Sequence, residues 1–308
     1  MLLAIEILTK WTPFFAIVTG IIGNIMSLLV TTKKDNRQIS TCVYMAGLAL
    51  VDTCVLVVNA VHLVILAHGV AIEMGADLYF LIFIWYGTDV FALISGLFLA
   101  AMSIDRAIAV TYPMKAATLC TASRARKVVV TTFPLALIVH SQAFFMYKLP
   151  DPPNGTVLVD FPQARWYEIF FNVYLVIFGT VGPFTILIIS NTVIIIGVRR
   201  AATKRQKIEL KTTRKNKEAN LTTMLLMTSF AYLVCSCPKR IYQTAVTGVY
   251  DLTDPYWSAR YWFQWWICTD LWRLNFAVNF YIYFLGGGQK FRNDTKEVMM
   301  RFLNGCFD

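Results

Sequence analysis

Long apolar runs separated by short polar connections dominate the sequence. A helix needs about 20 mostly apolar residues to cross the hydrocarbon core of a bilayer. The runs therefore predict seven membrane-spanning helices, with approximate bounds 11–32, 42–67, 78–110, 128–147, 166–198, 221–249 and 261–285. We expect the whole chain, residues 1–308, to form a single domain, an all-α bundle of seven transmembrane helices.

The residues after the seventh run follow a different pattern. The Gly286–Gly288 triplet should end the seventh helix, because glycine is a poor helix former. Apolar and basic residues then recur at helical spacing over about residues 288–303, which predicts a short amphipathic helix on the inner membrane surface. Cys306 follows this helix and is either a palmitoylation site or a free thiol.

The distribution of charge predicts the orientation of the helices. The formal net charge is +10, and the basic residues gather in alternate connections, above all in residues 199–217. Basic connections stay in the cytoplasm, so we expect a multi-pass plasma-membrane protein with its N-terminus outside and its C-terminus inside. Basic residues placed between apolar runs also argue against nucleic acid as a partner.

Two further features bear on this orientation. Asn154 begins a glycosylation sequon in the connection between the fourth and fifth runs, which is expected outside. Residues 1–10 have neither the basic segment nor the cleavage site of a secretory signal peptide, so the first span is expected to direct insertion.

Polar side chains inside the apolar runs need a physical reason, because an unpaired polar group in the membrane is costly. Four of the runs contain such residues, which are Asn24, Asp52, Ser95, Asn275 and Asn279. A cluster of this kind around one carboxylate is either a cation or proton site or a hydrogen-bond network that holds helices together. The residues themselves leave both interpretations open.

An acid and a base stand side by side at the inner end of the third run, as Asp105 and Arg106. The two side chains can pair within the helix and hold a charge ready for release. The alternative is that both charges simply extend toward the membrane surface at a helix end.

Short motifs at matching places in the seven runs resemble those of rhodopsin-like G-protein-coupled receptors. They are Gly23-Asn24, the segment ending at Asp52, Asp105-Arg106, Pro183, Cys235 with Pro238, and Asn279 with Tyr283 ahead of Phe291-Arg292. Each motif alone is weak evidence, but together they cover nearly the whole chain in the expected order. Residues 274–283 resemble invertebrate neuropeptide or chemosensory receptors of this class.

The resemblance implies roles for individual residues. Arg106 would be released from Asp105 on activation and would contact a heterotrimeric G protein, and Pro238 would let the sixth helix bend, with Tyr283 as a further switch residue. No cofactor is expected, but the resemblance implies an allosteric sodium ion held by Asp52, Ser95, Asn275 and Asn279.

The resemblance therefore implies a receptor for an extracellular ligand, a peptide, that signals through a G protein. Several family positions differ in this chain: Ala107 follows the arginine, Ser236 stands at the tryptophan switch, and Leu81 replaces the cysteine that pins the second outer loop. These differences leave a non-signalling or chemosensory seven-helix receptor as the alternative. A small transporter is disfavoured, because the chain shows no inverted repeats.

The ligand is expected at the outer end of the bundle. Amine receptors carry an aspartate at the position of Thr88, and opsins carry a lysine at that of Arg273, so neither an amine nor retinal is expected. The candidate ligand-binding residues are Thr88, Asp89, Lys239, Arg240, Gln243, Asp270 and Arg273. Their cations either capture an acidic group of the ligand or form internal salt bridges with Asp89 and Asp270.

No enzyme is expected. His62, His68 and His140 lack the spacing of metal ligands, and the sequence contains neither a glycine-rich phosphate loop nor a nucleophile elbow.

Overall fold

A computed structural model of the protein describes most of the chain. The described residues are 11–67, 76–141, 173–174, 177–206, 214–246 and 254–305. Within these ranges the regular structure is helical, and the isolated bridge between Ile39 and Thr121 is the only strand-like pairing described. The all-α class predicted from the sequence is confirmed.

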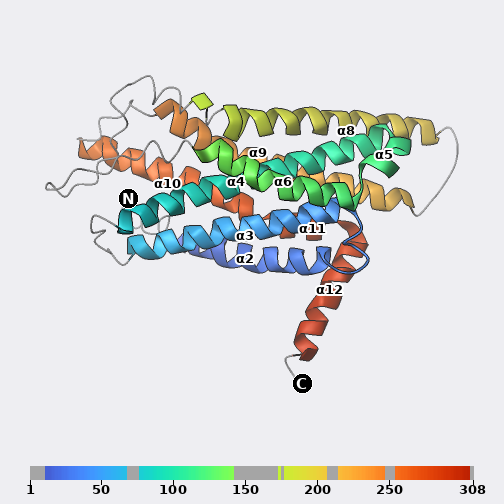
Figure 1. Ribbon diagram of the computed structural model, residues 1–308, viewed down its shortest axis with the longest axis horizontal. Helices are drawn as coiled ribbons and strands as arrows, with labels where there is room; N and C mark the ends of the chain where they lie inside the picture. The colour runs from blue at the N-terminus through green and yellow to red at the C-terminus, as the bar shows by residue number, and fades with distance from the viewer. Residues whose placement is uncertain are drawn as a thin grey trace.

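Seven long helical segments lie side by side and a further helix points away from them (Figure 1). The elements are α2 (Thr12–Thr31), α3 (Ser40–Ala67), α4 (Ala76–Thr111), α5 (Pro113–Leu119), α6 (Ala122–His140), the π-helical turn η3 (Ile177–Val181), α8 (Gly182–Gln206), α9 (Arg214–Val246), α10 (Pro255–Ala277), α11 (Asn279–Gly286) and α12 (Gly288–Gly305). The short α5 was not expected. α6 begins six residues before the interval 128–147 predicted for the fourth span, and residues 142–147 of that interval lie outside the described residues.

Four of the described helices are long and apolar enough to cross a membrane by length and composition, at Thr12–Thr31, Ser40–Ile65, Tyr86–Thr111 and Ile177–Arg200. The segments α6, α9 and α10 with α11 are more polar, yet they also turn apolar side chains outward. Ile138 on α6 is 71% exposed and Phe230 on α9 is 68% exposed. Large exposed apolar surfaces suit contact with lipid rather than water.

The core follows the central helices. α4 packs against α3, α6, α8 and α9, and its Ile94, Phe98 and Met102 are fully buried in the main hydrophobic cluster. α10 lies between α2 and α9. Gly20 on α2 makes this packing close, because a Cβ there would lie 2.9 Å from the Cα of Ala277.

The chain turns sharply where α11 meets α12. α11 ends at Gly286, α12 begins at Gly288, and Gly288 has a φ of 75°, a conformation that costs glycine little. The helix break predicted at the glycine triplet is confirmed. The elbow directs α12 away from the bundle (Figure 1), as expected for an amphipathic helix that lies along a membrane surface. We call this end of the bundle the α12 end.

Ionic contacts hold α12 against the turn that joins α2 to α3. Lys33 Nζ lies 2.8 Å from Asp294 Oδ1 and 2.7 Å from Glu297 Oε2. Asn36 donates to Asp294 at 3.0 Å and accepts from Lys290 at 2.9 Å. Two carboxylates, two lysines and an amide thus form one network, and α12 is fixed to the bundle at a second point besides the elbow.

The network should make the attachment of α12 depend on pH. Hydrogen bonds with Asp294 and Glu297 raise the pKa of Lys33 above its usual 10.5. Burial alone would raise the pKa of Asp294, but hydrogen bonds from Lys33 and Asn36 outweigh it and hold the pKa below 3.8. The network therefore contributes fully between these two ordinary values, and its contribution is lost as the pH falls through the lowered pKa of Asp294.

We expect Lys33→Gln to remove most of the pH dependence of stability that this network causes. The wild-type protein should lose on the order of 1 kcal/mol more stability than the variant between pH 7 and about pH 3, because Lys33 is the main group that depresses the pKa of Asp294 and the variant lacks it. Thermal unfolding of the purified protein at the two pH values measures the difference. Lys34→Gln, which removes an exposed neighbouring charge, should behave like the wild type. Equal pH dependence in all three proteins would contradict the role of the network.

Candidate functional site

The first polar site surrounds Asp52 in the middle of the bundle. Asp52 on α3 is completely buried, with an exposed fraction of 0%. One carboxylate oxygen accepts from Ser95 Oγ on α4 at 2.7 Å, and the other accepts from Asn279 Nδ2 on α11 at 2.6 Å. A single side chain therefore joins three helices, at a depth where unpaired polar groups are costly.

The break between α10 and α11 places Asn279 at this site. α10 ends at Ala277 and α11 begins at Asn279, so the last carbonyls of α10 lack the usual helical partners. Asn24 on α2 donates to the carbonyl of Phe276 at 3.0 Å and satisfies one of them. Asn275 is buried one turn before Asn279, but within the described structure it gives no hydrogen bond to Asp52.

The oxygen atoms around Asp52 fit a small hard cation. Such ions prefer carboxylate, hydroxyl and amide oxygens. Two buried oxygens of the surrounding residues, Asn24 Oδ1 and Tyr283 Oη, have no hydrogen-bond partner in the described structure, and Tyr283 lies within electrostatic reach of Asp52. Unsatisfied buried oxygens next to an anion are what an ion or ordered water would complete. The sodium assignment from the sequence is untested and stays a prediction.

The second site lies near the α12 end, where α4 meets the start of α3. Asp105 is buried and accepts from Ser40 Oγ at 2.8 Å. Arg106 donates to the neighbouring hydroxyl of Thr41, and its Nε is buried without a partner among the described residues.

The expected ion pair between Asp105 and Arg106 is not formed among the described side chains, so this detail of the sequence interpretation was wrong. Adjacent residues on a helix point about 100° apart. The two side chains instead take one hydroxyl each from Ser40 and Thr41, which are themselves adjacent at the start of α3.

The third site contains the charged residues at the opposite end of the bundle. Arg273 on α10 has an exposed side-chain fraction of only 2%, and its Nη1 lies 2.6 Å from Asp270 Oδ1. Its Nε donates to Asn59 Oδ1 on α3 at 3.3 Å. The second oxygen of Asp270 accepts from Thr12 Oγ1 on α2 at 2.8 Å. Arg273 is therefore neutralised within the bundle.

The other two cations of this end differ from Arg273 and from each other. Arg240 lies 3.8 Å from Asp89, whose side chain is 41% exposed, beside the half-buried Thr88. Lys239 has no carboxylate within 4 Å among the described residues. Its Nζ instead stands 3.5 Å above the ring of Trp272 and 5.9 Å from that of Trp265. Of the two acids proposed as partners, Asp89 therefore pairs with Arg240 and Asp270 pairs with Arg273. Lys239 contacts aromatic faces instead.

Some assigned residues lie outside this description. Asn154 and Cys306 are not among the described residues, and the side chain of Gln243 is not described either. Asn59, Ser40 and Thr41 belong to the sites but were not singled out from the sequence. Asn59 is a polar residue in an apolar run and could have been noticed for that reason, whereas serine and threonine are too common in such runs to carry a signal.

A family assignment follows from the sequence as a whole. Residues 23–294 match the profile of the family described as 7 transmembrane receptor (rhodopsin family). The chain belongs to this receptor family. The match runs from the residue before Asn24 through the bundle to Asp294 on α12, so it includes the residues of all three polar sites except Thr12.

Several individual receptors are similar to this one. The Mus musculus cysteinyl leukotriene receptor 1 is 28% identical over 231 residues, 74% of this chain and 62% of that receptor. The Drosophila melanogaster FMRFamide receptor is 27% identical over 305 residues, 89% of this chain and 50% of that receptor. The Rattus norvegicus somatostatin receptor type 1 is 26% identical over 231 residues, 73% and 56% respectively. The receptor thus spans less than two thirds of each relative.

Proposed function

We propose that the protein is a plasma-membrane receptor that binds an extracellular ligand and activates a heterotrimeric G protein. The observation that carries the proposal is the Asp52 site, where one buried carboxylate joins α3, α4 and α11 in a chain of the rhodopsin family. We infer that this charged contact can rearrange when the three helices move, so that a ligand that prefers one arrangement shifts the population toward it.

The orientation follows from loop charge. The helix ends and connections described at the α12 end carry most of the basic residues, including those of 199–206 and 214–217, so this end faces the cytoplasm and the charged site with Arg240 faces outside. Arg106, held by a single hydroxyl of Thr41, is then available to a G protein when the inner end of α9 moves. Pro238 lies within α9 and weakens the helix there, because proline removes a backbone hydrogen bond. A sodium ion beside Asp52 would favour the resting arrangement.

A peptide is the ligand class that we favour. The names of the Drosophila melanogaster and Rattus norvegicus relatives point to peptide ligands, and that of the Mus musculus relative to a cysteinyl leukotriene. The ligand feature that the outer site of this chain can bind is an acidic group, because Lys239 is the cation of this site whose charge no described carboxylate neutralises.

A signalling assay with a matched loss-of-coupling variant tests the proposal. Cells that express the receptor are screened with a peptide library for calcium and cAMP responses, and Arg106→Ala is the control. We expect at least one peptide to produce a response that Arg106→Ala loses at equal surface expression. If the wild-type receptor reaches the surface but neither ligand-free nor peptide-stimulated signalling exceeds that of untransfected cells, the chain is a non-signalling member of the family.

Lys239→Gln should lower the potency of an acidic ligand by about tenfold or more, because a charge-assisted hydrogen bond is lost. An analogue of the ligand with its carboxylate amidated should bind the wild type and the variant equally. Arg260→Gln is the matched control, since Arg260 also stands over an aromatic ring, 5.6 Å from that of Trp257, but at the exposed start of α10. Equal loss in both variants, or none in Lys239→Gln, would contradict capture of the acid by Lys239.

A further inference from the structure

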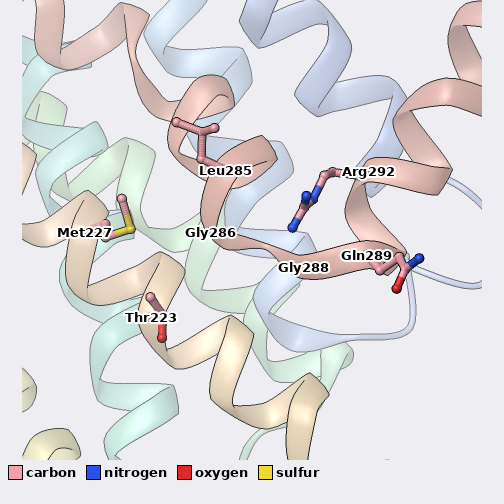
Figure 2. A pocket seen from close by; sticks show the side chains of 7 residues that line it. All are labelled: Thr223, Met227, Leu285, Gly286, Gly288, Gln289 and Arg292. Carbon is pink, nitrogen blue, oxygen red and sulfur yellow. The ribbon is translucent and has the colours of Figure 1, made fainter.

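A cavity of about 520 Å³ opens where α9 crosses the elbow between α11 and α12 (Figure 2). Thr223 and Met227 of α9 form one wall, Leu285 at the end of α11 forms another, and Gln289 and Arg292 of α12 close the third side. It belongs to none of the three polar sites described above.

The cavity faces outward and not into the helix bundle. Met227 is 40% exposed and Leu285 is 69% exposed. Met224 and Tyr283, on the same two helices, belong to the main hydrophobic cluster and are each 1% exposed. The two helices touch closely at this point, since a Cβ at Gly286 would lie 3.3 Å from the Cα of Met224. In a membrane the cavity therefore opens toward lipid.

The depth of the cavity in the membrane follows from α12. The elbow ends the last membrane-spanning segment, and α12 turns away from the bundle at this point (Figure 1). An amphipathic helix of this kind lies at the boundary between the acyl chains and the headgroups. Gly288, at its start, is one of the residues that line the cavity. The cavity thus lies at headgroup depth, with its apolar wall on the acyl-chain side.

The polar side of the cavity carries an uncompensated positive charge. Arg292 is exposed, and its guanidinium points back toward the Gly286–Gly288 segment in Figure 2. No described carboxylate lies within 4 Å of it, in contrast to Arg301 on the same helix, which lies 2.8 Å from Glu297. A guanidinium binds phosphate oxygens with two parallel hydrogen bonds. Thr223 and Gln289 add a hydroxyl and an amide at the rim.

We propose that this cavity binds one anionic phospholipid of the adjacent leaflet. Arg292 holds the phosphate, with Thr223 and Gln289 beside the headgroup, and the upper part of an acyl chain lies against Met227 and Leu285. The bound lipid connects α9 with the elbow of α11 and α12. The site depends only on insertion of the chain into a membrane, so it does not rest on the signalling activity proposed above.

Native mass spectrometry of the purified full-length receptor in detergent tests the site. The protein is titrated with phosphatidylglycerol and, separately, with phosphatidylcholine. Arg292→Gln should weaken binding of the first phosphatidylglycerol about fivefold, the effect of one basic residue near an anionic lipid, with phosphatidylcholine unchanged. Arg301→Gln removes a cation of the same helix outside the cavity and should bind both lipids like the wild type. Thr223→Trp, which fills the cavity and keeps Arg292, should also weaken binding of phosphatidylglycerol.

Three outcomes would overturn the proposal. Equal weakening by Arg292→Gln and Arg301→Gln would mean that lipid is attracted to the helix by diffuse charge. Full binding by Thr223→Trp would place the lipid elsewhere. Displacement of phosphatidylglycerol by an equal concentration of inorganic phosphate would mean a site for free anions, since the acyl chain would then contribute nothing.

Discussion

Asp52→Asn should abolish the effect of sodium on the stability of the receptor while leaving the fold intact. Asparagine has the shape of aspartate and can still accept from Asn279, and its amide can donate to Ser95, so the hydrogen bonds at 2.6 and 2.7 Å can be kept in reoriented form. Only the charge is removed, and with it the main attraction for a cation in a buried, low-dielectric site.

Thermal unfolding in sodium chloride and in choline chloride measures this effect. A bound ion stabilises the folded state according to its concentration and affinity, by about 1.4 kcal/mol at ten times the dissociation constant. We expect this gain in the wild type and none in Asp52→Asn. Asp89→Asn is the control, because it removes a carboxylate that is 41% exposed and lies away from Asp52, at the end of the bundle opposite α12. A sodium effect that persists in Asp52→Asn would contradict a sodium site at this carboxylate.

Asp270→Ala should destabilise the receptor by about 3–5 kcal/mol, the usual effect of removing one partner from a buried ion pair. Arg273 would keep its charge with a side chain only 2% exposed, and Asn59 alone could not neutralise it. We expect a large fall in the unfolding temperature and in the amount of receptor at the cell surface. Asp89→Ala, which breaks the more exposed contact with Arg240 at 3.8 Å, should cost about 1 kcal/mol or less.

A double variant separates this structural role from ligand binding. Asp270→Leu combined with Arg273→Met removes both charges and should restore much of the stability, because apolar residues often replace a buried pair without loss. If Asp270→Ala folded normally and merely lost ligand potency, Arg273 would belong to the ligand site after all. The burial of Arg273 and its contacts with two side chains make the structural outcome our expectation.

The fold of this receptor could be read from its apolar runs, because a membrane makes the length of a spanning helix predictable. The glycine triplet predicted the elbow for a local reason, since Gly288 adopts a positive φ. Asp52 could be recognised as functional because a carboxylate in an apolar run needs partners. Ser95 and Asn279 were placed beside it by resemblance to a family, and the structure brings both within hydrogen-bond distance.

The roles of the charged residues could not be read in the same way. Lys239, Arg240 and Arg273 look alike in the sequence, as cations in polar stretches of the sixth and seventh spans. Their surroundings distinguish them: Arg273 has a carboxylate at 2.6 Å, Arg240 has one at 3.8 Å, and Lys239 has aromatic rings. Asp105 and Arg106 are adjacent in the sequence, yet each binds a hydroxyl of α3 and not the other.

The sequence by itself determined the helical class, the number of spans, the break before α12 and the expected orientation. All of these depend on local composition and on the uniform thickness and charge preference of a bilayer. Only the tertiary structure decided which buried charges are neutralised, and it shows that Arg273 has a carboxylate at 2.6 Å while Lys239 lies against aromatic rings with no described carboxylate within 4 Å. The reason is physical: the free energy of a buried charge depends on the atoms within a few ångströms of it, and those atoms come from helices far apart in the chain.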